Sequence, residues 1–203
     1  SFGASSLGGV FHPINEKEGI KAVHTAVDNG INFIDVSPYY GYLKAENVLG
    51  KALKEIDRNR YYLSTKVGRY GKDGENHWDY SAKKSKESVY ESMDRLNIDY
   101  IDLINVHDIE FADLDLIINE TLPALVELKE KGVVLKHFKY VIDNVPSGMV
   151  DTILSFCHYC LIDDALVDYL EYFENKEIGV INASPFSMGL LTERGAPSWH
   201  PAP

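Results

Sequence analysis

The sequence has 203 residues, of which 45% are hydrophobic and 25% are charged. This length and balance are typical of one globular domain with a sizeable core, and they exclude a disordered or fibrous chain. The formal net charge of −11 argues against a nucleic-acid partner, because phosphate backbones are bound by basic patches. No stretch approaches the roughly 20 apolar residues that span a bilayer, so we expect no membrane partner either.

Two cysteines, Cys157 and Cys160, are too few for a disulfide framework, which makes a reducing cytoplasm the expected location. Their C-x-x-C spacing also occurs in redox motifs and in half-sites for zinc. Redox motifs usually open a helix, however, whereas this pair closes a predicted strand, and no second cysteine pair completes a metal site. We therefore expect both side chains to pack in the core, and we expect no metal site.

Short apolar runs alternate along the chain with longer segments of helical periodicity. The predicted strands are 1–5, 31–36, 61–67, 100–107, 150–157 and 178–184. The predicted helices are 15–30, 46–56, 81–96, 116–131 and 163–175. Asn15 with Glu18 is suited to cap the start of the first helix, and Gly30 is suited to end it. This alternation implies parallel strands joined by helical crossovers.

Both a closed barrel and an open doubly wound sheet are built from such an alternation. The first strand is not followed by G-x-G-x-x-G, which an open dinucleotide-binding sheet would usually show. Polar residues also recur at the carboxyl ends of successive strands, where (β/α)₈ barrels hold their active sites. We therefore predict an α/β fold of the (β/α)₈ TIM-barrel class, forming a single domain over residues 1–203.

Two irregularities indicate that this barrel is incomplete. After Gly132, residues 133–135 run almost directly into a helix-like stretch, 136–145, which leaves too little chain for a fifth strand and its loop. We expect a segment of the natural protein to be absent near Val134 and Leu135. About seven strands precede Pro203, so we also expect the eighth strand and the C-terminal part of the domain to be missing.

Ionisable side chains occupy the carboxyl ends of three successive strands. Asp35 ends the second strand, Lys66 the third and His107 the fourth, and Tyr40 follows Asp35 in the loop. Adjacent parallel strands lie about 4.8 Å apart, so Asp35 and Lys66 can form an ion pair. A lone ion pair or a lone strand-end histidine is usually structural. The combination at three neighbouring strand ends favours a catalytic group.

This group suits the reduction of a carbonyl. A phenol with a pKa of about 10 is a poor acid at neutral pH, and a nearby ammonium lowers that pKa. We expect Lys66 to do so for Tyr40 and Asp35 to keep Lys66 charged and in place. His107 would donate a hydrogen bond to the substrate oxygen. The hydride has to come from a cofactor, because no side chain supplies one.

Several motifs resemble those of the aldo-keto reductase family, in the same order and with similar spacing along the whole chain. They are residues 35–41 followed by Glu46 and Leu49-Gly50, the lysine strand 64–66, residues 99–103 leading to His107, and the seventh-strand region 183–192. The runs 153–160 and 184–192 are most similar to the L-galactose dehydrogenase-like branch of that family.

The resemblance implies a barrel enzyme that uses NADP or NAD, with Asp35, Tyr40, Lys66 and His107 as its catalytic group. The cofactor contacts that it implies are Gly3, Ala4, Ser5 and Asp35 near the nicotinamide ribose, and Ser184 and Phe186 along the pyrophosphate. The sequence departs from the family where the fifth-strand serine-asparagine pair and the eighth-strand loop have no counterpart. Ala183 also replaces a tyrosine that often stacks on the nicotinamide.

Substrate contacts are expected from Tyr40 and His107 and from two further residues. Trp78 lies in a long loop, 69–80, after the third strand, where loops often shape substrate pockets. A surface loop is the alternative interpretation. His158 ends the predicted strand 150–157 and is a candidate for the barrel mouth, although strand alternation alone does not choose its face.

The leading function is therefore an NAD(P)-dependent oxidoreductase that interconverts a carbonyl and an alcohol on a small aldehyde or aldose. Oxidation of L-galactose, or of a similar aldose, to its lactone is one such reaction. The alternative is a nucleotide-binding regulatory or scaffold subunit with the same barrel and little turnover. By resemblance to the family we expect a monomer.

Overall fold

The computed structural model describes residues 1–71, 77–136, 150–193, 195–198 and 200. Contacts between residues divide the chain into two compact units, which span Ser1–His137 and Phe138–Pro203. The prediction of one barrel domain over the whole chain stays a prediction.

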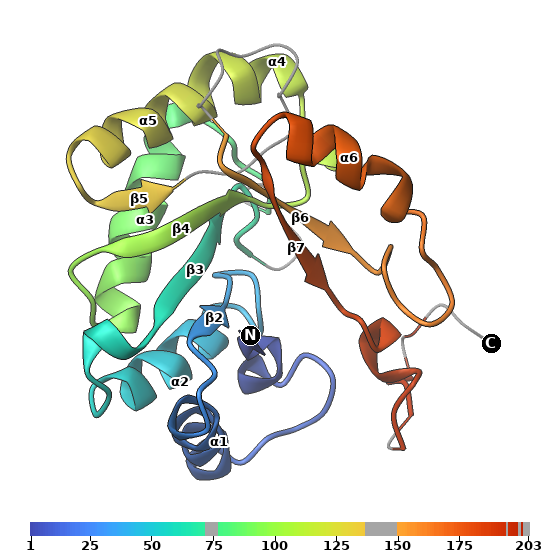
Figure 1. Cartoon of the computed structure of the whole chain (residues 1–203). Coiled ribbons are helices and arrows are strands. Elements are labelled where there is room, and N and C mark those ends of the chain that lie inside the picture. The colour runs from blue at the N-terminus through green and yellow to red at the C-terminus, as the bar shows by residue number, and fades with distance from the viewer. Residues whose placement is uncertain (72–76, 137–149, 194, 199, 201–203) are drawn as a thin grey trace. The chain divides into compact units, whose positions relative to one another are not determined.

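The first unit is built on a parallel five-stranded sheet, in the order β1-β2-β3-β4-β5 (Figure 1). Its strands are β1 (Phe2–Gly3), β2 (Phe33–Asp35), β3 (Tyr62–Val67), β4 (Ile101–Val106) and β5 (Val134–Lys136). Gly3 pairs with Asp35, Asp35 with Ser64, and Lys66 with Asn105. Because all strands run in one direction, their carboxyl ends lie at the same edge of the sheet.

Helices connect these strands and pack side by side, α1 on α2, α2 on α3 and α3 on α5. The helices are α1 (Glu16–Asp28), α2 (Lys44–Leu53), α3 (Ala82–Leu96), α4 (Leu114–Leu116) and α5 (Leu122–Glu130), with a π-helical turn (Ile117–Thr121) before α5. The Asn15 side chain accepts a hydrogen bond from the Lys17 amide at 2.9 Å, which confirms the predicted N-cap. The alternation of strand and helix follows the sequence pattern.

The core of this unit lies between the sheet and its helices. Ile34 on β2, Leu63 on β3, Ile104 on β4 and Leu49 on α2 are fully buried. Each such side chain contributes roughly 1.5–3 kcal/mol relative to an exposed position. All of β3 after Tyr62 is buried, as expected for a parallel strand covered on both faces. The packing of these strands fixes the positions of the residues at their carboxyl ends.

The fifth strand is present where the sequence suggested an interruption. β5 pairs in parallel with β4, with Ile101 opposite Val134 and Leu103 opposite Lys136. Lys136 was expected to begin a helix-like stretch, and this was wrong, because pairing with β4 overrides local periodicity. The rest of that stretch, 137–145, lies outside the described residues, and the absence of a segment near Val134 and Leu135 stays a prediction.

The second unit contains β6 (Thr152–Phe156), α6 (Val167–Asn175) and β7 (Gly179–Ala183). The two strands pair in parallel, and α6 packs on β7 through a small cluster of Leu166, Phe173 and Ile178. The sequence placed the start of α6 at residue 163, but Asp163 forms an isolated β-bridge with Cys160 and residues 165–166 form a turn. The Asp163 carboxylate accepts from the Ala165 amide, which favours a turn over a helix there.

Candidate active site

Tyr40 lies in a loop that packs tightly on the 3-10 helix Ala4–Gly8. Gly41 has a φ of +61°, and a Cβ there would approach the Gly8 carbonyl oxygen to 2.3 Å. Gly8 in turn leaves no room for a Cβ, which would lie 2.7 Å from the Tyr40 carbonyl oxygen. Glycine at both positions therefore lets two backbone segments meet. This contact fixes Tyr40 close to the end of β2.

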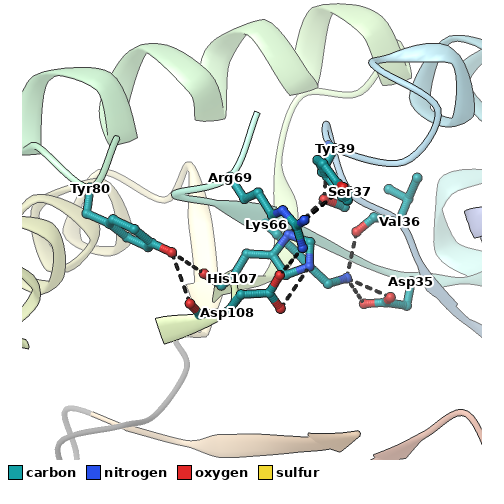
Figure 2. Close-up of polar contacts among 9 residues, drawn as sticks. All are labelled: Asp35, Val36, Ser37, Tyr39, Lys66, Arg69, Tyr80, His107 and Asp108. Carbon is teal, nitrogen blue, oxygen red and sulfur yellow. Dashed lines mark hydrogen bonds and ion pairs between the residues drawn. The ribbon is translucent and has the colours of Figure 1, made fainter. Parts of the chain in front are cut away.

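Asp35 and Lys66 form the ion pair that the sequence predicted. Lys66 Nζ donates to Asp35 Oδ1 at 2.8 Å, to Asp35 Oδ2 at 2.7 Å and to the Val36 carbonyl at 2.8 Å (Figure 2). The Lys66 side chain is only 4% exposed. Ser64 Oγ donates to Asp35 Oδ1 at 2.9 Å and accepts from Asn105 Nδ2 at 3.1 Å. Two side chains of β3, supported by Asn105 on β4, thus hold the carboxylate of β2 in a single orientation.

The phenol of Tyr40 lies beside this ion pair, with Lys66 Nζ 5.1 Å from the centroid of its ring. Burial raises the pKa of Tyr40 above its ordinary value of 10, and this effect outweighs the opposing effect of Lys66. The sequence led us to expect a lowered pKa, and the net direction is the opposite, because desolvation is the largest cause. Tyr40 is therefore held as a protonated phenol.

Lys66 keeps its charge in this environment. Burial alone would lower the pKa of Lys66, but the Asp35 carboxylate and Tyr40 outweigh it and raise that pKa above the usual 10.5. The ammonium can stabilise negative charge on the Tyr40 oxygen whenever that phenol loses its proton. The expected role of Asp35, to keep Lys66 charged and in place beside Tyr40, therefore agrees with the geometry.

His107 follows β4 and is buried, with its ring edge-on to Tyr40 at 5.8 Å between centroids. Burial lowers the pKa of His107 well below 6.5, and the positive charges of Lys66 and Arg69 act in the same direction. The imidazole is therefore neutral at neutral pH. Its Nδ1 lies 3.2 Å from Ser37 Oγ, and the Tyr80 hydroxyl donates to the His107 carbonyl at 2.7 Å.

Two charged residues that sequence reasoning missed lie next to His107. Arg69, just after β3, forms an ion pair with Asp108, the residue that follows His107 (Figure 2). Its guanidinium also donates to the Tyr39 hydroxyl at 2.8 Å and stacks 3.6 Å from the centroid of that ring. Asp108 Oδ1 lies 3.4 Å from His107 Nε2. Arg69 and Asp108 could have been identified from the sequence, because each lies just after a strand that carries a catalytic residue at its carboxyl end.

Trp78 lies in the loop after β3 and contacts Arg69. It forms a β-bridge with Arg69, whose guanidinium lies 4.5 Å from the indole ring. Phe111 and Tyr80 lie beside the indole, with centroids 5.4 Å and 6.3 Å away. Residues 72–76 of the loop lie outside the described residues. Trp78 therefore joins the site through Arg69, and its contact with substrate stays a prediction.

The predicted cofactor residues of the first unit lie near Asp35. Gly3 is its partner in the β1–β2 ladder, and the next residues, Ala4 and Ser5, open the 3-10 helix. A Cβ added at Gly3 would meet no atom within 4 Å, so the backbone beside the ion pair borders open space. A flat aromatic ring can approach such a backbone closely, so these residues fit a nicotinamide.

The remaining predicted contacts belong to the second unit. Ser184 follows β7 with a φ of 55°, and Phe186 is 60% exposed. His158 is exposed, and its Nδ1 lies 3.1 Å from Asp163 Oδ2. Their roles as cofactor and substrate contacts stay predictions.

Both cysteines are free and partly exposed, so the expectation of core packing for them was wrong. Cys157 directly follows β6, where its Sγ lies 3.8 Å from the Ser184 carbonyl oxygen. Among the described residues, no group of three or more His, Cys, Asp or Glu side chains is arranged to hold a metal ion. No helix among these residues is both long enough and apolar enough to cross a membrane.

The sequence matches the profile of the Aldo/keto reductase family over residues 1–202. The chain belongs to this family. It is similar to L-galactose dehydrogenase of Arabidopsis thaliana, with 49% identity over 99% of this chain and 65% of that protein. It is also similar to D-threo-aldose 1-dehydrogenase of a Pseudomonas species, with 30% identity over 95% of this chain and 67% of that protein.

Among solved structures, an aldo-keto reductase from Bacillus halodurans in its holo form superposes with a TM-score of 0.80. The two chains are 28% identical, and the match covers 98% of this chain and 65% of that one. The family and this superposition confirm the predicted fold class, an α/β fold of the (β/α)₈ barrel type. The chain thus spans about two thirds of the length of these relatives.

Proposed function

We propose that the protein is an NAD(P)-dependent oxidoreductase that interconverts a carbonyl and an alcohol on a small aldehyde or aldose. Its catalytic residues are Asp35, Tyr40, Lys66 and His107. The observation that carries the proposal is the cluster itself. A buried, charged Lys66 lies 5.1 Å from the Tyr40 ring, and a neutral His107 lies edge-on to the same ring.

In the reductive direction, Tyr40 donates its phenolic proton to the substrate oxygen. The Lys66 ammonium stabilises the phenolate that results, and Asp35 holds that ammonium in place. In the oxidative direction, Tyr40 first has to lose its proton, and the phenolate, stabilised by the Lys66 ammonium, then accepts the proton of the alcohol. His107 is neutral, so it can donate one N–H to the substrate oxygen and orient it without adding a charge to the site.

A bound nicotinamide cofactor supplies or accepts the hydride, since no side chain does so. Gly3, Ala4, Ser5 and Asp35 are the residues of the first unit that would hold its nicotinamide end. The open space beside Gly3 and the position of Gly3 next to Asp35 support this assignment. Ser184 and Phe186 are the proposed contacts to the pyrophosphate, and both NAD and NADP remain candidates.

An aldose is the substrate class that the relatives support best. The Arabidopsis relative at 49% identity is an L-galactose dehydrogenase, and the Pseudomonas relative acts on D-threo-aldoses by its name. We therefore propose oxidation of L-galactose, or of a similar aldose, to the lactone as the specific reaction. Trp78 and His158 are the proposed further contacts to the sugar. We also propose that the enzyme is cytoplasmic and monomeric.

A steady-state screen of the full-length protein tests this function. L-galactose, other aldoses and small aldehydes are each assayed with NAD and with NADP, in both directions, by nicotinamide absorbance. Turnover of at least one aldose is the expected result. Tight cofactor binding without turnover on the whole panel would contradict it and would favour the regulatory or scaffold subunit.

A further inference from the structure

Ser37 lies in the loop after β2 and contacts His107 directly. It is fully buried, and its Oγ lies 3.2 Å from His107 Nδ1 (Figure 2). The Tyr39 backbone N–H donates to the same Oγ at 3.1 Å. That donation engages one lone pair of the hydroxyl oxygen and leaves its proton free to point at Nδ1. A serine hydroxyl in this position is equipped to donate to the ring.

The opposite nitrogen of the ring faces a carboxylate. Asp108 Oδ1 lies 3.4 Å from His107 Nε2, and Arg69 holds the other carboxylate oxygen of Asp108. A neutral imidazole carries a proton on one nitrogen and a lone pair on the other. A lone pair on Nε2 would face a negative oxygen and be repelled, whereas an N–H on Nε2 would be attracted to it.

The Ser37 contact is compatible with either tautomer, because its Oγ can donate to Nδ1 or accept from an Nδ1–H, and the Asp108 contact favours the proton on Nε2. With the proton on Nε2, Nδ1 accepts from the Ser37 hydroxyl and Nε2–H points toward Asp108. With the proton on Nδ1, the attraction at Nε2 becomes a repulsion. The Tyr80 hydroxyl anchors the backbone of His107 by donating to its carbonyl at 2.7 Å, and the contacts to Ser37 and Asp108 hold the ring itself.

We infer that Ser37 is a positioning residue that, together with Asp108, holds His107 as the tautomer protonated on Nε2. Its catalytic consequence rests on the proposed function. A substrate oxygen at Nε2 needs a donor, and the other tautomer would present a lone pair to it. Loss of the Ser37 hydroxyl removes one buried hydrogen bond, which corresponds to a fall of about tenfold in kcat, with a smaller change in KM.

The tautomer can be measured directly in the full-length protein by ¹⁵N NMR of histidine side chains. Protonated and unprotonated ring nitrogens have well-separated chemical shifts, and the spectrum of a His107→Gln variant assigns the signals. We expect a protonated Nε2 and an unprotonated Nδ1 at neutral pH in the wild type. A proton on Nδ1, or on both nitrogens, would overturn the inference, and this measurement needs no variant of Ser37.

Ser37→Ala tests whether the hydroxyl is the cause. We expect a larger share of the Nδ1-protonated tautomer and the tenfold loss of kcat. Ser92→Ala is the matched control, because Ser92 is also fully buried and accepts a hydrogen bond, from Arg95 at 3.1 Å, but lies on α3 away from the site. An unchanged tautomer or an unchanged kcat in Ser37→Ala would overturn the role of Ser37.

The two proposals fail in distinguishable ways. If the wild type turns over no substrate, the proposed function fails, while the NMR measurement still decides the tautomer. If the wild type turns over an aldose but its His107 carries the proton on Nδ1, the function stands and the role of Ser37 is wrong.

Discussion

Lys66 Nζ lies within 2.8 Å of both carboxylate oxygens of Asp35, so one ion pair joins the carboxyl ends of β3 and β2. The lysine is almost completely removed from water. A buried charge without a partner is costly, so each group depends on the other to remain ionised. The proximity of Tyr40 places this pair where a phenolate would form.

Replacement of Asp35 by asparagine tests this dependence. Burial lowers the pKa of Lys66 and Asp35 is the largest cause that raises it, so Asp35→Asn should shift the Lys66 pKa downward. It should also destabilise the protein by about 3 kcal/mol, because an uncompensated buried charge remains. A ¹³C NMR titration of the Lys66 ε-methylene measures the pKa. An unchanged pKa in Asp35→Asn would show that the pair does not control the charge of Lys66.

The buried, neutral His107 should make the protein less stable in weak acid. Its folded-state pKa lies well below 6.5, whereas its unfolded-state pKa is about 6.5. Below pH 6.5 the His107 imidazole therefore takes up a proton in the unfolded chain but stays neutral in the folded protein. The free energy of unfolding falls with pH by at most about 1.4 kcal/mol per unit from this cause.

Urea unfolding at several values between pH 7 and pH 5 measures this effect. Wild type and His107→Gln are compared, because acidic side chains contribute equally to both. The wild type should lose more stability on acidification than the variant does. Parallel curves for the two proteins would mean that His107 takes up its proton in the folded state as well.

Glu46 on α2 should be a strong determinant of stability. It is fully buried, accepts from Thr65 Oγ1 at 2.7 Å and pairs with Arg95 Nε at 2.7 Å. Glu46→Ala removes the closer carboxylate of Arg95, leaves that charge with the more distant Glu91 at 3.8 Å, and should cost about 3 kcal/mol in the free energy of unfolding. Lys83→Ala removes an exposed pair with Glu87 at 3.9 Å and should cost less than about 1 kcal/mol. Equal losses would contradict this account.

Two helical glycines should respond in opposite ways to alanine. A Cβ at Gly50 would lie 2.0 Å from the Arg95 carbonyl oxygen, so α2 and α3 would have to separate, at a cost of about 1–3 kcal/mol or more. A Cβ at Gly19 meets the end of the Leu7 side chain at 3.0 Å, which can move. Gly19→Ala should therefore be neutral or stabilising through helix propensity. Thermal unfolding of both variants checks the difference.

The sequence predicted the strands, the main helices and the Asp35–Lys66 pair, because all of them follow from periodicity. Strand alternation places Asp35 and Lys66 on the same face of the sheet, with Lys66 two residues beyond Ser64, the partner of Asp35. Buried apolar residues mark β2, β3 and β4. The fifth strand was harder, since β5 has three residues and depends on its pairing with β4. A strand this short, which forms because it pairs with a distant strand, leaves little recognisable pattern in the sequence.

The residues around His107 depend on loop geometry that periodicity does not describe. Asp108 adopts a positive φ of 49°, and Arg69 reaches it from the loop after β3. Ser37 was part of a recognised motif, yet its contact with Nδ1 is visible only once both loops are in place. The direction of the Tyr40 pKa was also wrong, because the degree of burial is a property of the assembled site.

The central claim is that Tyr40 transfers the proton, and the Tyr40→Phe variant tests it most directly. With an aldose that the wild type turns over, kcat should fall by at least about a hundredfold, the usual contribution of a positioned acid or base. Cofactor binding, followed by nicotinamide fluorescence, should be retained. Tyr62→Phe, which alters a 59% exposed tyrosine at the start of β3, should keep the wild-type rate. An unaltered rate in Tyr40→Phe would contradict the account.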